Sequence, residues 1–185
     1  MFGFATLGLA MGGVAAETIP FDATRSHAEF EVRAMWLFDV EGRFGGVSGS
    51  VILDSAARSA QVDALIDAGS IDMHRDSYEE WVKSSEFFDV ARYPQIHFLS
   101  EPFPLAMLDD GGDIAGALTV RGVTRQASFN LRPSECTPHA ARSCPVLADG
   151  IIQRTDFGMT THRATLSDRV RLHFTVFAAA SVDRS

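Results

Sequence analysis

The sequence predicts an all-β protein in which about eight antiparallel strands close into a barrel that carries one short helical insertion. The first observation is an alternation of apolar and polar residues, clearest near the C-terminus, where Val170, Leu172, Phe174 and Val176 share one face of a strand. The second is that only one segment spaces its apolar residues as a helix does. Closure into a barrel removes the exposed edges of an open sheet, although a two-sheet sandwich also fits the pattern.

Length and composition indicate a single domain with a neutral or apolar partner. The chain has 185 residues, of which 46% are hydrophobic, enough for one substantial core and too apolar for disorder. Its formal net charge of -8 repels phosphate backbones and anionic lipid head groups. We therefore expect no nucleic-acid partner and no electrostatic docking to membranes.

Residues 1–16 have the pattern of a secretory signal peptide. They carry no charge, contain an apolar run from Phe2 to Val14 and end in the small residues Ala15 and Ala16. The usual basic start is absent, which suggests a truncated or misassigned first residue, and a buried N-terminal segment is the alternative. The run is too short and too rich in glycine to predict a membrane span, so no stable membrane insertion is expected. The barrel domain would then comprise residues 17–185.

Two cysteines, Cys136 and Cys144, lie in a stretch at 133–145 whose proline and alanine residues predict a loop. In an oxidising compartment such a pair favours a local disulfide, which would restrict the unfolded chain by about 2 to 3 kcal/mol. A metal pair assisted by His139, or two free thiols, are the alternatives. A metal ion needs more ligands than these residues supply, so no metal site is predicted.

The first half of the chain predicts four strands. Alternation at residues 28–32 and an apolar run at residues 35–40 predict the first two. Glycines then punctuate an apolar segment that ends at Leu53, which predicts a strand that bends sharply or carries a bulge. Alternation at residues 62–66 predicts the fourth.

A helical insertion follows, and then the remaining strands. Apolar residues at helical spacing within 77–83 predict a short amphipathic helix, and residues 85–88 predict a further helical turn. Pro94 ends that region and directs the chain into a strand that carries Ile96 and Phe98 inward. The other predicted strands are a hairpin at 114–120 and 127–131 and two last strands at 150–157 and 169–178.

The inward face of the barrel predicts a ligand site. A barrel of about eight strands has room for one small ligand. Alternation alone does not distinguish such a tunnel from side chains that pack on one another as a solid core, which is the commoner outcome. If the interior is open, its predicted lining is Phe30, Val32, Phe44, Val51, Leu53, Ile66, Phe87, Phe88, Phe98, Leu118, Phe129, Phe157, Leu172 and Phe174.

Six segments stand out in order, namely SHAEFEV at 26–32, GRF at 42–44 leading to GSV at 49–51, SSEFFD at 84–89, YPQIHF at 93–98, GALTVRGVT at 116–124 and RTDFG at 154–158. Taken together, they resemble those of the YceI-like family, a lipocalin-like group of secreted bacterial proteins that bind polyisoprenoids. The resemblance runs over about residues 19–178. It implies an extended antiparallel eight-stranded barrel of the lipocalin type with an apolar tunnel.

The resemblance also implies a function. The protein would bind a long isoprenoid chain, such as a polyprenyl or quinone tail, and carry or sequester it in the periplasm; no other cofactor is implied, and a homodimer is left open. Our head-group candidates are His97, Arg154 and Asp156, with structural ion pairs or exposed strand residues as the alternative. This chain departs from the family pattern in its cysteine loop and in Met35 and Trp36, either of which could alter the tunnel mouth.

The sequence contains no recognisable catalytic motif. Its six histidines are scattered without the i, i+4 spacing of a helical metal site, and there is no Gly-x-Ser-x-Gly elbow. We therefore predict that the protein is not an enzyme. Two other functions remain open, namely a stress-response or interaction protein with a packed barrel and functional loops, and a hydrolase of lipidic substrates that uses Asp156 or His97.

Overall fold

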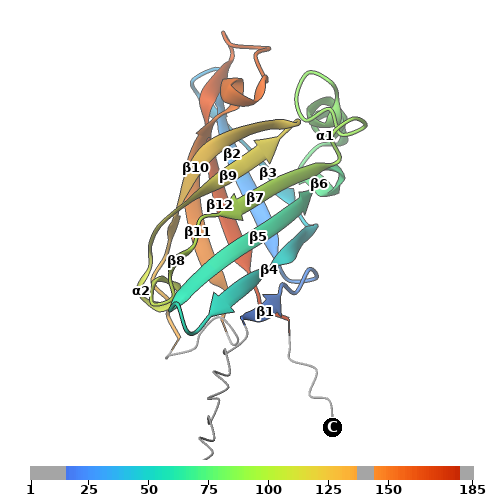
Figure 1. Ribbon diagram of the computed structural model, residues 1–185. Coiled ribbons are helices and arrows are strands. Elements are labelled where there is room, and N and C mark those ends of the chain that lie inside the picture. Colours follow the sequence, from blue (N-terminus) through green and yellow to red (C-terminus); the bar gives the residue numbers. More distant parts are fainter. Residues whose placement is uncertain (1–15, 137–143, 180–185) are drawn as a thin grey trace, which may run out of the picture.

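A single antiparallel sheet of twelve strands curls around an apolar interior (Figure 1). The computed structural model describes residues 16–136 and 144–179, so the predicted signal peptide lies outside the described residues. The predicted all-β, antiparallel, lipocalin-like architecture is confirmed. The sheet has more than the eight predicted strands because β1 (Glu17–Pro20), β6 (Ile71–Met73) and β8 (Phe103–Pro104) are too short to show an alternating pattern.

Nine longer strands form most of the wall. In the sheet the order is β1-β4-β5-β7-β9-β10-β11-β12-β2-β3-β6, with β8 paired to β5. The longer strands are β2 (His27–Ala34), β3 (Phe38–Phe44), β4 (Val47–Asp54), β5 (Ser59–Asp67), β7 (Gln95–Ser100), β9 (Gly112–Val120), β10 (Val123–Leu131), β11 (Val146–Gln153) and β12 (Leu166–Val176).

Short segments join the two ends of this strand order. Strand β1 pairs with β4, and the next residue, Phe21, forms a β-bridge with Ala178 just beyond β12. At the other end of the order, β6 pairs with β3 and follows β5 through the 3-10 helix η1 (Ala68–Ser70). The curled sheet therefore leaves little edge exposed, as a barrel requires.

The two α-helices of the described residues lie at opposite ends of the barrel (Figure 1). Helix α1 (Asp76–Lys83) confirms the predicted helical insertion and buries Val82, while its Lys83 pairs with Glu79 one turn earlier at 2.6 Å. Helix α2 (Met107–Asp110) buries Leu108 at the other end. The α1 end also carries the β2–β3 turn and the segment that includes the 3-10 helix η3 (Arg154–Phe157).

The apolar run at residues 35–40 was expected to be a strand, and that expectation is wrong for its first half. Ala34 pairs with Phe38 across the β2–β3 hairpin, so residues 35–37 form the connecting turn. Met35 and Trp36 adopt positive φ angles of 48° and 62°. An apolar run normally indicates a strand because most loops are polar, and this turn breaks that rule.

Two other expected elements have different bounds. Strand β11 ends at Gln153 and the chain turns into η3, so residues 154–157 are not strand. Residues 85–88 form hydrogen-bonded turns, such as the one in which the Phe87 N–H donates to the Ser84 carbonyl at 3.1 Å, and not a helix. Both segments are short, so their conformation is determined by local hydrogen bonds and not by a repeating pattern of apolar residues.

Glycines on the inner face make room for aromatic rings. Gly42 lies opposite Phe30 and Gly150 opposite Phe129 in neighbouring strands. A Cβ atom on Gly42 would lie 2.4 Å from Phe30 Cε1, and one on Gly150 would lie 2.3 Å from Phe129 Cδ1. Each ring therefore occupies the space of a missing side chain, a pairing that supports curvature in a β-sheet.

The predicted disulfide between Cys136 and Cys144 is present, with their Cα atoms 6.4 Å apart. It closes the connection between β10 and β11, of which residues 137–143 are outside the described part of the chain. The Ser134 N–H donates to the Asp109 carbonyl of α2 at 2.9 Å. The cysteine loop therefore starts at the α2 end of the barrel, opposite the turn that holds Met35 and Trp36.

Candidate ligand-binding cavity

An apolar cavity of about 410 Å³ occupies the interior of the barrel. Its lining runs from Leu108 and Leu131 near α2 to Tyr78 and Trp81 in α1, so the cavity extends between the two ends. This volume lies within the range of about 300–1,000 Å³ that is typical of small-molecule sites. The inward side chains thus do not fill the interior as a solid core would.

Most of the residues predicted to line a tunnel do line this cavity. Leu53 does not, because it packs against the core at the end of β4, and neither does Phe157, which is buried in η3. Whether the lining residues bind lipid stays a prediction. Those that line the cavity are Phe30, Val32, Phe44, Val51, Ile66, Phe87, Phe88, Phe98, Leu118, Phe129, Leu172 and Phe174.

The wall offers few hydrogen-bonding groups to a ligand. Of its 39 residues, all in the described part of the chain, only five have side chains with nitrogen or oxygen atoms, namely Glu29, Tyr78, Trp81, Arg154 and Thr165. A polar ligand would lose its hydrogen bonds to water and recover almost none along such a wall. The cavity therefore favours a hydrocarbon ligand.

Two groups of aromatic rings shape the bore. Phe30, Phe44 and Phe88 form one group with ring centroids 5.4 to 6.3 Å apart. In the other group, Phe129 contacts Phe98 at 4.8 Å and Phe174 at 5.1 Å, edge to face in both cases. Such edge-to-face pairs are the favoured geometry for aromatic side chains and hold the rings in place.

The cavity opens at the α1 end. Met35, Tyr78 and Thr165 both line the cavity and are exposed to solvent, and all three belong to elements at that end. At the α2 end the lining residues Leu108 and Leu131 are buried. The fourth exposed lining residue, Glu29, alternates with buried residues in the middle of β2 and is not part of either end.

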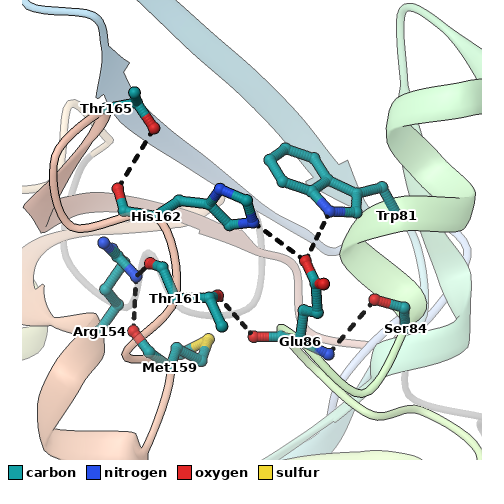
Figure 2. Close-up of polar contacts among 8 residues, drawn as sticks. All are labelled: Trp81, Ser84, Glu86, Arg154, Met159, Thr161, His162 and Thr165. Carbon is teal, nitrogen blue, oxygen red and sulfur yellow. Dashed lines mark hydrogen bonds and ion pairs between the residues drawn. The ribbon is translucent and has the colours of Figure 1, made fainter.

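A group of three side chains ties the two sides of this opening together (Figure 2). We call Trp81, Glu86 and His162 the mouth latch. The Glu86 carboxylate accepts hydrogen bonds from Trp81 Nε1 at 2.9 Å and from His162 Nε2 at 3.0 Å. The Trp81 and His162 rings also meet edge to face at 5.0 Å. The latch joins α1 and the turn after it to the segment between η3 and β12.

Hydrogen bonding stabilises the ionised form of Glu86 in the latch. The hydrogen bond from His162, followed by that from Trp81, lowers the pKa of Glu86 below its ordinary value of 4.5. Thr161 Oγ1 adds a hydrogen bond to the Glu86 carbonyl at 3.2 Å. Both the carboxylate and the backbone of Glu86 therefore hold the far side of the opening.

Arg154, one of the predicted head-group residues, lines the cavity but is only 3% exposed. Its guanidinium donates to the carbonyls of Met159 at 2.5 Å and Thr161 at 2.7 Å (Figure 2). It also donates to the carbonyls of Ser167 at 3.0 Å and Leu166 at 3.2 Å. Burial lowers the pKa of Arg154, yet an arginine remains charged in proteins. Its main structural effect is to fold the segment that carries His162.

The other two head-group candidates lie outside the cavity lining. His97 Nε2 contacts Asp63 Oδ1 at 2.8 Å on the outer face of the sheet, between the inward residues Ile96 and Phe98. Asp156 is exposed in η3. Alternation already placed His97 on the outer face, whereas the 3-10 turn that exposes Asp156 leaves no pattern in the sequence.

The sequence did not predict the mouth latch. Trp81 was recognised as an apolar helix residue, but its partners Glu86 and His162 are 76 residues apart in the chain. No spacing rule connects residues so distant. The inward residues Ile114 and Val120 could have been added to the predicted lining, because they share a strand face with Leu118.

Comparison with known proteins agrees with this geometry. The family model of the YceI-like domain matches residues 20–178. This chain belongs to the YceI-like family. Protein YceI of Salmonella agona, strain SL483, is 29% identical over 183 residues, which cover 95% of this chain and 93% of that relative. A YceI protein of Salmonella arizonae is 28% identical over the same coverage.

Two solved structures share the fold of this chain. BcnA of Burkholderia cenocepacia has a TM-score of 0.70 at 22% identity, covering 86% of this chain and 99% of that one. A polyisoprenoid-binding domain from Saccharophagus degradans, implicated in plant cell wall breakdown, has a TM-score of 0.63 at 19% identity, covering 90% and 99%. At these identities the likeness shows a shared fold and nothing more.

No helix among residues 16–136 and 144–179 is both long and apolar enough to cross a membrane. Within the same residues, no three or more His, Cys, Asp or Glu side chains are grouped so as to hold a metal ion.

Proposed function

We propose that this YceI-like protein binds a long isoprenoid chain in its barrel and carries or sequesters it. The observation that carries the proposal is the apolar cavity that runs through the barrel and opens at one end. A related fold is that of a polyisoprenoid-binding domain, which supports the ligand class. An open cavity also favours a binding role over a packed barrel whose loops alone would be functional.

The binding energy would come from burial of hydrocarbon. A polyprenyl or quinone tail has almost no polar atoms, so its affinity depends on the apolar area removed from water. At about 0.3 kcal/mol per heavy atom, a twenty-carbon tail gains roughly 6 kcal/mol and a forty-carbon tail roughly 12 kcal/mol. These free energies correspond to dissociation constants of roughly tens of micromolar and a few nanomolar.

The head group would stay at the opening. Tyr78 and Thr165 supply the hydroxyl groups among the lining residues there, next to exposed Met35. Arg154, in contrast, already donates to four carbonyl groups. A modest polar head group that remains partly in water fits this arrangement better than a buried charged one.

We place the protein in the periplasm and assign it no catalytic activity. The apolar leader pattern at residues 1–16 and the disulfide between Cys136 and Cys144 both support an oxidising compartment outside the cytoplasm. The pair of His97 and Asp63 lies on the outer face, away from the cavity in which a lipidic substrate would lie. It is therefore a structural pair and not a hydrolytic one.

Solvent extraction of the purified protein tests the proposal. We expect mass spectrometry to detect a prenyl lipid in stoichiometric amount, and we expect Ala64→Phe and Ala148→Phe, which fill the cavity from two strands, to remove it. The matched control is Ala117→Phe, which adds the same side chain to β9 at a residue that is not part of the lining. Lipid that is equally abundant in the blocked and control variants would contradict the proposal.

A further inference from the structure

Four consecutive apolar residues protrude from the barrel at the β2–β3 hairpin. We call Met35, Trp36, Leu37 and Phe38 the apolar tip. Their exposed fractions are 55%, 74%, 79% and 60%, which is unusual because large apolar side chains normally lose this area to packing. A cluster of this kind on a protein surface indicates an interaction site.

The backbone holds the tip in a costly conformation. Met35 and Trp36 have φ angles of 48° and 62°, in the left-handed region where Gly, Asn and Asp are the favoured residues of a hairpin turn. Bulky residues stay there at the expense of folding stability. The turn therefore keeps apolar side chains where turn geometry alone would select small polar ones.

Hydrogen bonds fix the direction in which the tip projects. The Met35 N–H donates to the Thr165 carbonyl at 2.6 Å, and the Leu37 N–H donates to the Ala34 carbonyl at 3.1 Å. At the base of the hairpin, Arg33 Nε pairs with Asp39 Oδ1 at 3.0 Å. The apolar tip therefore lies at the end of the hairpin, and the ion pair between Arg33 and Asp39 lies directly below it.

The tip is continuous with the opening of the cavity. Met35 belongs both to the tip and to the cavity lining, and Tyr78 of α1, which is 41% exposed, also lines the cavity. Five of the seven exposed large apolar side chains among the described residues lie at this end, and the other two, Leu99 and Ile151, lie in β7 and β11. A hydrocarbon path therefore runs from the tip into the barrel.

We propose that the apolar tip inserts into the interface of a lipid bilayer and sets the cavity opening against the membrane. This inference rests on the proposed function, because an isoprenoid ligand must leave or enter a bilayer. Trp36 and Phe38 are residues that favour the membrane interface. Because the net charge is -8, electrostatic attraction to anionic lipids does not drive the docking. The docking is therefore apolar and depends little on salt.

Binding to phosphatidylcholine vesicles tests the docking. We expect the protein to partition onto vesicles at low and high salt alike, with a blue shift of Trp36 emission. This shift should be lost in Trp36→Phe, in which Trp81 of the mouth latch is the remaining tryptophan. The variants Trp36→Asn and Leu37→Asn should lower the partition coefficient by at least about tenfold. Because Asn suits a positive φ, Trp36→Asn should fold at least as stably as the parent.

Controls separate docking from other roles of the tip. Leu99→Asn removes a side chain that is 38% exposed near the end of β7 that leads toward β8 and α2, away from the opening, and should leave partitioning unchanged. Absence of partitioning, or partitioning that the tip variants do not alter, would overturn the inference. It would also be overturned if the tip variants instead converted a dimer into a monomer, because the tip would then face a second copy of the chain.

The failure of docking and the failure of the proposed function give different results. Binding of a short prenol is measured in solution without vesicles, where the tip is not needed. Tip variants should bind this prenol as the parent does while exchanging a long prenol with vesicles more slowly. A protein that docks but binds no prenol would refute the proposed function alone, and one that binds prenol but never docks would refute the docking alone.

Discussion

At the scale of single residues, one buried guanidinium holds the backbone of the segment that borders the cavity opening. Arg154 donates to four backbone carbonyl groups of residues 159–167 and has no carboxylate among its hydrogen-bond partners. Nearby, the Thr155 N–H and hydroxyl donate to Asp168 at 3.0 and 2.8 Å. This segment lacks regular secondary structure over most of its length, so side-chain hydrogen bonds take the place of a strand ladder.

Replacement of Arg154 by Met should lower the free energy of unfolding by roughly 2 to 4 kcal/mol, because it leaves buried carbonyls without donors. Urea unfolding measures the change. Arg163→Met, at an exposed position of the same segment, is the matched control and should cost little. Equal losses in the two variants would show that the carbonyls do not depend on Arg154.

The mouth latch should loosen in acid. Hydrogen bonds from His162 and Trp81 lower the pKa of Glu86, so the latch contributes fully above the ordinary value of 4.5 and loses its contribution as the pH falls through the lowered pKa. In a Trp36→Phe background, Trp81 emission should change over this acid range and should not titrate in Glu86→Gln. Glu80→Gln, on an exposed face of α1, is the control that keeps the titration. An identical acid titration in the Glu86 variant would refute this role.

At the scale of elements, pairs of a glycine and an aromatic residue let the strands curve around an open bore. Phe30 covers Gly42, and Phe129 covers Gly150. The sequence did predict bending at the glycines of the β3–β4 region, since glycine in a strand pattern marks a bend or a close approach. It did not predict Gly150 as a partner of Phe129, because pairing across strands distant in sequence depends on the register of the finished sheet.

Gly150→Ala should destabilise the fold by about 1 to 3 kcal/mol, because its Cβ would overlap the Phe129 ring. Gly45→Ala, where a Cβ would meet nothing within 4 Å, should be close to neutral. The urea midpoint at a constant m-value measures both changes. If both variants unfold like the parent, the ring and the glycine are not in contact in solution.

The disulfide should stabilise the chain without affecting the ligand. Changing Cys136 and Cys144 together to Ser should lower the free energy of unfolding by about 2 to 3 kcal/mol in the chain-entropy model. The loop starts beside α2, at the end opposite the opening, so prenol affinity should stay the same. A loss of affinity in parallel with stability would place the cysteine loop in the binding site.

At the scale of the whole molecule, the sequence predicted the barrel and its inward residues better than the opening of the cavity. Alternation with a period of two identified most of the inward residues, since each strand places every second side chain on the same face. The opening depends on residues such as Arg154 and His162, whose partners are set by the folded backbone and leave no periodic signal. The turn at Met35 and Trp36 escaped prediction because its residues have the composition of a strand.

Affinity as a function of chain length tests whether the cavity holds an isoprenoid. Dissociation constants for prenols of increasing length should fall by about tenfold for each five-carbon unit, since five heavy atoms at about 0.3 kcal/mol each give roughly 1.5 kcal/mol. The decrease should stop once the chain exceeds the cavity, and it should be weaker in Ala148→Phe. Dissociation constants that do not depend on chain length would contradict the account.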